Sequence, residues 1–139
     1  MMSIMNIRGD FSIITQDVRF SEANKALDLF NVVDSVQVDS FPSVIALKVV
    51  SRFTIEGTPD SPQLEITYWV INPDGTREQV RDRDESVGYH LNVNVERDAQ
   101  RSGNILGLNL SVSAPGTYKI ISQYGSKELT SISLDVTSS

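Results

Sequence analysis

The chain has 139 residues, of which 40% are hydrophobic and 22% are charged, as is typical of one globular domain with its own core. Its formal net charge is −6 and its sequence pI is about 4.6. Such an excess of carboxylates repels phosphate, which argues against wholesale binding of nucleic acid or docking on an anionic membrane. The chain contains no cysteine, which excludes disulfides, thiolate metal sites and cysteine nucleophiles.

The first ten residues, MMSIMNIRGD, are predicted to form a tail ahead of the domain. They lack the basic start and the apolar run of roughly 7–15 residues that a secretory signal needs. No stretch of the chain approaches the roughly 20 apolar residues of a transmembrane helix. We therefore expect a cytoplasmic protein that does not insert into a membrane.

The first half of the chain alternates apolar and polar side chains with the period of two that half-buried strands show. We predict strands at residues 11–20, 26–38, 44–55 and 64–71. The stretch 26–38 is apolar on both faces, which favours an inner strand of a two-layer structure. The run Asn72-Pro73-Asp74-Gly75 predicts a tight turn after the fourth strand.

In the second half, a polar strand or loop at 76–85 precedes an alternating strand at 87–95, and a charged loop is expected at 97–103. Residues 105–136 then read as three consecutive antiparallel strands. Proline and glycine in Ala114-Pro115-Gly116 favour a turn between the first two. Gly125-Ser126 has the pattern of a two-residue hairpin loop of type II′ between the last two.

This pattern amounts to about eight short strands with turn signals every 8–12 residues and no long helix. It predicts an antiparallel β-sandwich, immunoglobulin-like or a similar Greek key, because several strands have one apolar and one polar face. A small β-barrel is the alternative. The domain is expected to span residues 11–136, with a C-terminal tail at 137–139.

Several short motifs resemble those of one family of small, mostly bacterial proteins catalogued as a domain of unknown function. They are Asp17-Val18, Lys25-Ala26-Leu27, residues 30–36, Ser40-Phe41-Pro42, Arg52-Phe53, Asn72-Pro73-Asp74-Gly75 and Pro115-Gly116-Thr117-Tyr118. The resemblance covers residues 11–136 and implies a β-sandwich-like fold, without implying an activity. The chain departs from the family pattern at 77–86 and at Asn31, near which a glycine is expected.

The sequence predicts no catalytic residue, metal site or cofactor. His90 is the only histidine, so one chain cannot form a two-histidine metal site, and no G-x-S-x-G nucleophile motif is present. An EF-hand register starting at Asp82 places Val87 at the glycine position and Val93 at the glutamate position, so it fails. We interpret the acidic run 82–85 as a solvated loop balanced by arginines, and an irregular carboxylate site with Asp74 or Asp98 as the alternative.

One polar sheet face is the strongest candidate for ligand binding. The alternation places Trp69 opposite the core-facing Tyr68 on its strand, and other polar positions fall on neighbouring strands. The candidate ligand-binding residues are Trp69, His90, Asn92, Asn94 and Arg52. An indole among amides and a cation would suit a sugar or a peptide. The competing interpretation is that Trp69 packs against its own sheet.

We therefore predict a non-enzymatic binding or assembly module that interacts through a sheet face or an edge strand, with a protein partner or as a homo-oligomer. Residues 103–113 are the candidate edge strand, because they are apolar enough to pair with another chain. A structural role in a virus particle is one variant of this prediction. The alternatives are a small carboxylate- or metal-dependent hydrolase and a carbohydrate- or peptide-binding module around Trp69.

Overall fold

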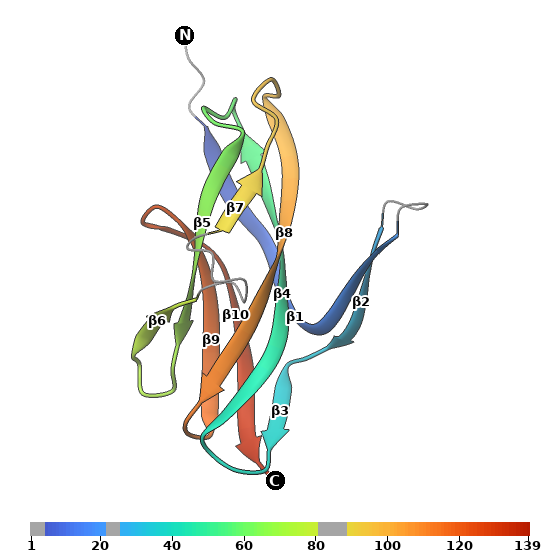
Figure 1. The fold of residues 1–139 in the computed structure, drawn as a ribbon. Coiled ribbons are helices and arrows are strands. Elements are labelled where there is room, and N and C mark those ends of the chain that lie inside the picture. Colours follow the sequence, from blue (N-terminus) through green and yellow to red (C-terminus); the bar gives the residue numbers. More distant parts are fainter. Residues whose placement is uncertain (1–4, 22–25, 81–88) are drawn as a thin grey trace.

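The computed structural model describes residues 5–21, 26–80 and 89–139, and within these residues every regular element is a β-strand. Figure 1 shows long strands running along the molecule in two layers. The strands are β1 (Asn6–Ser21), β2 (Ala26–Val32), β3 (Ser35–Val38), β4 (Ser43–Glu56), β5 (Gln63–Ile71), β6 (Arg77–Gln79), β7 (Tyr89–Asn92), β8 (Ala99–Val112), β9 (Gly116–Tyr124) and β10 (Lys127–Ser138). No described segment is a helix that could cross a membrane.

The strands form two sheets. The first sheet has the order β2-β1-β4-β8, and the second has the order β3-β10-β9-β5-β6, with β7 also paired to β5. Every pairing is antiparallel except that of β3 with β10. The predicted β-sandwich is confirmed.

The core lies between the two sheets, where the alternating apolar side chains of the long strands meet. Its largest fully buried side chains include Tyr68 on β5, Tyr118 on β9 and Phe53 on β4. Burying a Val, Leu, Ile or Phe side chain contributes about 1.5–3 kcal/mol, so this layer supplies most of the driving force for folding. Its hydrophobic residues alternate with outward polar ones along β5 and β8, as the sequence pattern predicts.

A chain of polar side chains crosses this apolar interior from the first sheet to the second. Its members are Ser12, Ser51, Asn104, Tyr68, Ser122 and Thr130. The Tyr68 hydroxyl donates to Asn104 Oδ1 at 2.7 Å, and Ser12 Oγ donates to Thr130 Oγ1 at 2.7 Å. These hydrogen bonds link the first sheet to the second across the core, while Asn104 Nδ2 is buried with no hydrogen-bond partner among the described residues.

The predicted single strand at 26–38 is wrong, because the chain changes sheets within it. β2 pairs with β1 in the first sheet, and β3 pairs with β10 in the second. Near the end of β2, Asn31 has a φ of 56°, in the left-handed region that favours glycine and, after it, asparagine. A stretch that contributes to both layers in succession has apolar residues on both faces, which explains the misleading pattern.

The predicted three-stranded meander at 105–136 is correct only in its second half. β9 and β10 form the expected hairpin, and Gly125 has the positive φ, 59°, that its turn requires. β8, however, lies in the other sheet, so residues 113–115 carry the chain across the sandwich. The Tyr118 hydroxyl donates to the Ala114 carbonyl at 2.7 Å, which holds this crossing in place in the manner of a tyrosine corner.

Several strand boundaries also differ from the prediction. β10 extends to Ser138, so residues 137 and 138 pair with β3 instead of forming a C-terminal tail. β1 begins at Asn6, and Ile7 is buried, so residues 6–10 belong to the sandwich instead of a tail. β8 begins at Ala99, inside the predicted charged loop, because β4 pairs with it along its whole length. Of the predicted strand at 87–95, residues 89–92 form β7, while residues 87 and 88 lie outside the described part of the chain.

Candidate functional site

The sandwich has a long open edge on β8. Within the described residues β8 pairs only with β4, and β6, an end strand of the second sheet, pairs only with β5. Residues 103–112 of the candidate edge segment 103–113 thus lie on an end strand of the first sheet, as the described residues form it, while Ser113 lies beyond β8.

The hydrogen-bond alternation identifies which backbone groups of β8 point outward. The Gly57 N–H donates to the Asp98 carbonyl at 2.6 Å, one step beyond the Glu56–Ala99 pair. In an antiparallel ladder every second pair is hydrogen-bonded. The even-numbered residues of β8 thus direct their backbone groups to β4, and Gly107, Asn109 and Ser111 direct theirs to the open edge.

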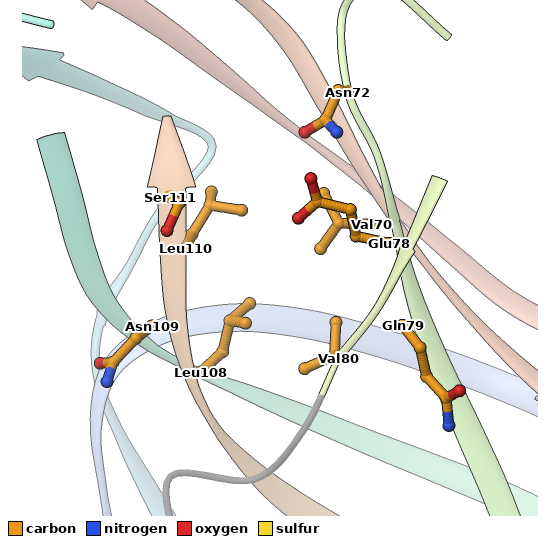
Figure 2. A pocket seen from close by; sticks show the side chains of 9 residues that line it. All are labelled: Val70, Asn72, Glu78, Gln79, Val80, Leu108, Asn109, Leu110 and Ser111. Carbon is orange, nitrogen blue, oxygen red and sulfur yellow. The ribbon is translucent and has the colours of Figure 1, made fainter. Parts of the chain in front are cut away.

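A groove with a volume of about 300 Å³ lies between this edge and the β5–β6 hairpin. It is lined by Val70, Asn72, Glu78, Gln79, Val80, Leu108, Asn109, Leu110 and Ser111. Figure 2 shows Leu108 and Leu110 pointing from β8 across the groove toward Val80 and Val70. The floor is therefore apolar, while amides, a hydroxyl and the Glu78 carboxylate form the rim.

A second hollow of about 590 Å³ continues the groove toward the end of β8. Asn72, Glu78 and Ser111 line both hollows, and the second extends past Pro73 and Asp74 to the Tyr118 crossing. The site is thus elongated and follows the direction of the strand. This shape suits an extended chain better than a compact small molecule.

The charge along the groove is negative. Glu78 and Asp74 are its only charged lining residues, and neither takes part in an ion pair within the described residues. Hydrogen bonds from the Thr76 hydroxyl and then the Thr76 N–H lower the pKa of Asp74, so its carboxylate stays ionised at neutral pH. Arg77, beside Glu78 on β6, lies over the Trp69 ring, with Cζ 5.2 Å from the ring centroid.

Three of the five residues predicted to bind a ligand lie on the same face of one sheet. Trp69 lies on the outer face of the second sheet, which also holds His90, opposite Glu65, and Asn92, opposite Gln63. Trp69 and Glu65 are four residues apart on β5, a distance of ~13 Å along the strand. Trp69 is half-buried beneath Arg77, and its indole N–H is buried without a hydrogen-bond acceptor among the described residues. This arrangement restricts access to the ring.

The other two predicted residues lie elsewhere. Arg52 is on the first sheet, where it lies over the Phe11 ring and pairs with Asp10 at 3.4 Å. Asn94 follows β7, and its N–H donates to Gln100 Oε1 at 2.8 Å. The prediction that Arg52 and Asn94 lie beside Trp69 assumed that their strands share one sheet.

The alternative carboxylate site cannot be built from the described residues. The acidic run 82–85 lies outside them. Asp98 accepts a hydrogen bond from the Thr58 hydroxyl, and Asp74 accepts those from Thr76. Within the described part of the chain no group of three histidine or acidic side chains could hold a metal ion.

Comparisons with known proteins give one structural likeness. No family model matches the chain, and no curated protein matches it in sequence. Among solved structures, an immunoglobulin-like protein from Pseudomonas aeruginosa is similar over 94% of this chain and 96% of its own, with 14% sequence identity and a TM-score of 0.43.

Proposed function

We propose that this chain is a non-enzymatic binding module that accepts an extended polypeptide segment as an additional strand beside β8. The observation that carries the proposal is the row of outward backbone groups at Gly107, Asn109 and Ser111, which runs beside an apolar groove. Strand addition uses such groups for hydrogen bonds, and the groove receives alternate side chains of the added strand.

The composition of β8 supports this use of its edge. Proteins usually protect exposed edges with lysine, proline, other charges or a β-bulge. Residues 103–112, GNILGLNLSV, contain no charged residue and no proline, and their register with β4 is continuous. Within the described part of the chain, this stretch therefore has none of the usual protections against pairing with another strand.

The residues that line the groove favour binding over catalysis. Among the described residues, they include hydroxyl groups such as those of Thr76 and Ser111, and the carboxylates of Asp74 and Glu78, but neither histidine nor lysine. A hydroxyl nucleophile needs an adjacent base of suitable pKa. A hydrolase is consequently a poorer account of this groove than a peptide-binding module.

The direct test is a ¹⁵N NMR titration with the synthetic heptapeptide Ac-Thr-Val-Thr-Val-Thr-Val-Thr-NH₂. We expect the amide signals of Gly107, Asn109 and Ser111 to shift on binding. Asn109→Pro removes one outward donor and should weaken binding at least tenfold, whereas Asn109→Ala retains the donor and should bind as the parent protein does.

Two further measurements keep the test decisive. If Asn109→Pro does not fold, Ser111→Pro replaces it, and the same peptide with every backbone nitrogen methylated should not bind to the parent protein. Unchanged affinity in a folded proline variant, or signal shifts confined to residues distant from β8, would contradict the proposal.

A further inference from the structure

We infer that the segment accepted beside β8 carries a lysine or arginine at one inward-facing position, with an apolar residue at the next inward-facing position. This inference rests on the proposed function and specifies the chemistry of the partner. It follows from the positions of Glu78 and Val80 on the wall that faces β8.

Glu78 lies on β6, and Val80 directly follows β6 and continues its pairing with β5, because the Val80 N–H donates to the Tyr68 carbonyl at 2.8 Å. The two residues are two positions apart, so their side chains point to the same side. Figure 2 shows Val80 level with Leu108, and the Glu78 carboxylate nearer Leu110 and Ser111. Two residues of a strand span roughly 6.6–6.8 Å, which is also the spacing of successive inward-facing side chains on an added strand. One inward-facing side chain of the added strand would therefore contact Val80 and Leu108. The next inward-facing side chain would lie near the Glu78 carboxylate.

The negative charge of the groove favours a cationic side chain at the inward-facing position near Glu78. Among the described residues, the two hollows are lined by the Glu78 and Asp74 carboxylates and by no cationic side chain. Arg77 cannot neutralise Glu78 from within the groove while its guanidinium lies over Trp69. A lysine or arginine can lay its methylene stem on the apolar floor and extend its charge to these carboxylates.

A second copy of the chain does not fit this requirement. Of the strands at the sheet edges, β2 (26–32) and β3 (35–38) contain no lysine or arginine, and β8 carries Arg101 only ahead of its uncharged stretch 103–112. The edge strand β6 contains Arg77, but it is three residues long and the Arg77 guanidinium lies over Trp69. Two copies with a net charge of −6 also repel each other. A different protein with a basic, alternating segment is the partner that the groove favours.

The experiment compares three synthetic peptides that differ only at the central residue. They are Ac-Thr-Val-Thr-X-Thr-Val-Thr-NH₂ with X as lysine, glutamate or valine, a pattern of inward-facing residues that is the same in either strand direction. At low salt we expect the lysine peptide to bind about three- to tenfold more tightly than the glutamate peptide, because the ion pair is exposed and so contributes modestly. Raising the salt from 0.05 to 0.5 M should reduce this preference.

Protein variants then assign the preference to one carboxylate. Glu78→Gln should lower the affinity for the lysine peptide about threefold and leave the valine peptide unaffected, while Glu78→Lys should make the glutamate peptide the tighter ligand. Glu128→Gln is the matched control, because Glu128 is an exposed carboxylate at the start of β10 and lines neither hollow.

The outcomes separate this inference from the proposed function. Equal affinities for all three peptides, with shifts at Gly107, Asn109 and Ser111, would overturn the charge preference and leave strand addition intact. A lysine preference that survives in Glu78→Lys would also overturn it. Failure of every peptide to bind would overturn both the preference and the proposed function.

Discussion

Tyr118 shows how much a single hydroxyl can determine in this sandwich. Its ring is buried in the core, while its hydroxyl donates to the Ala114 carbonyl four residues earlier. This bond closes the segment that carries the chain from β8 in the first sheet to β9 in the second. The aromatic ring thus contributes to the core, and its polar end fixes the connection.

We predict that Tyr118→Phe lowers the free energy of unfolding by about 1–1.5 kcal/mol. The ring packing remains, but the hydroxyl loses its bond to the Ala114 carbonyl and the longer bond, 3.4 Å, that it accepts from the Ala114 N–H. Urea denaturation followed by circular dichroism measures the change. Tyr124→Phe is the matched control: Tyr124 lies on the same strand, and within the described residues no hydrogen bond of its hydroxyl occurs. Equal losses in the two variants would show that the Ala114 bond has no special role.

Asn31 has a backbone conformation that few residues with a side chain adopt. Its φ is 56°, in the left-handed region that favours glycine. Asparagine tolerates this conformation better than most residues, and its side-chain amide also donates to Gln16 Oε1 at 2.8 Å. The side chain thus adds a hydrogen bond at a position where glycine would offer backbone freedom alone.

At the scale of the element, β8 has two unlike sides. Its even-numbered residues direct their backbone groups to β4, and their side chains, from Leu106 to Val112, are buried in the core. Its odd-numbered residues have their backbone groups at the open edge, and Asn109 and Ser111 are exposed. A single strand thereby anchors the first sheet and presents a surface on which another strand can pair.

This difference predicts an alternation in amide hydrogen exchange along β8. The amides of Leu106, Leu108 and Leu110 should exchange slowly, and those of Gly107 and Asn109 at least tenfold faster, because backbone hydrogen bonds protect only the first set. Residues 48–51 of β4, which pair with strands on both sides, serve as the internal control and should show no such alternation. Uniform protection along β8 would mean that its edge is already covered.

At the scale of the whole molecule, the two sides of the sandwich differ. On one side β1 approaches β10, where Ser12 bonds to Thr130 and Lys127 Nζ donates to the Ile7 carbonyl at 2.7 Å. On the other side β8 and the β5–β6 hairpin leave the groove between them. The sheets are thus held together at one margin and accessible at the opposite one.

The closed side depends on Gly9. A Cβ added at Gly9 would lie 2.6 Å from the Leu129 carbonyl carbon and closer still to its oxygen, so β1 and β10 would have to separate. We predict that Gly9→Ala lowers the free energy of unfolding by about 3 kcal/mol, the upper end of overpacking effects. Urea denaturation measures this loss.

Gly75→Ala provides the comparison for that experiment. Gly75 has a φ of 90° and nothing within 4 Å of an added Cβ, so this variant introduces backbone strain without a steric clash. It should lower the free energy of unfolding by about 1–2 kcal/mol. If Gly9→Ala were the milder of the two, the close approach of β1 and β10 would not be a critical contact.

The sequence was sufficient to predict the all-β class, most of the strands and the Gly125-Ser126 hairpin, because each depends on alternation or turn chemistry within a short window. It could not determine where the chain changes sheets after Asn31 and after Val112, because both crossings depend on pairing between distant strands.

The candidate site, too, could be predicted only in part from the sequence, and the rest required the tertiary structure. The open edge of β8 was foreseen from its uncharged, apolar composition. Glu78 and Val80 were not identified, because they lie in a polar segment whose three-residue strand is too short to show a period. Only the tertiary structure placed them opposite Leu108 and Leu110, because the two walls of the groove come from different sheets, about thirty residues apart in the chain.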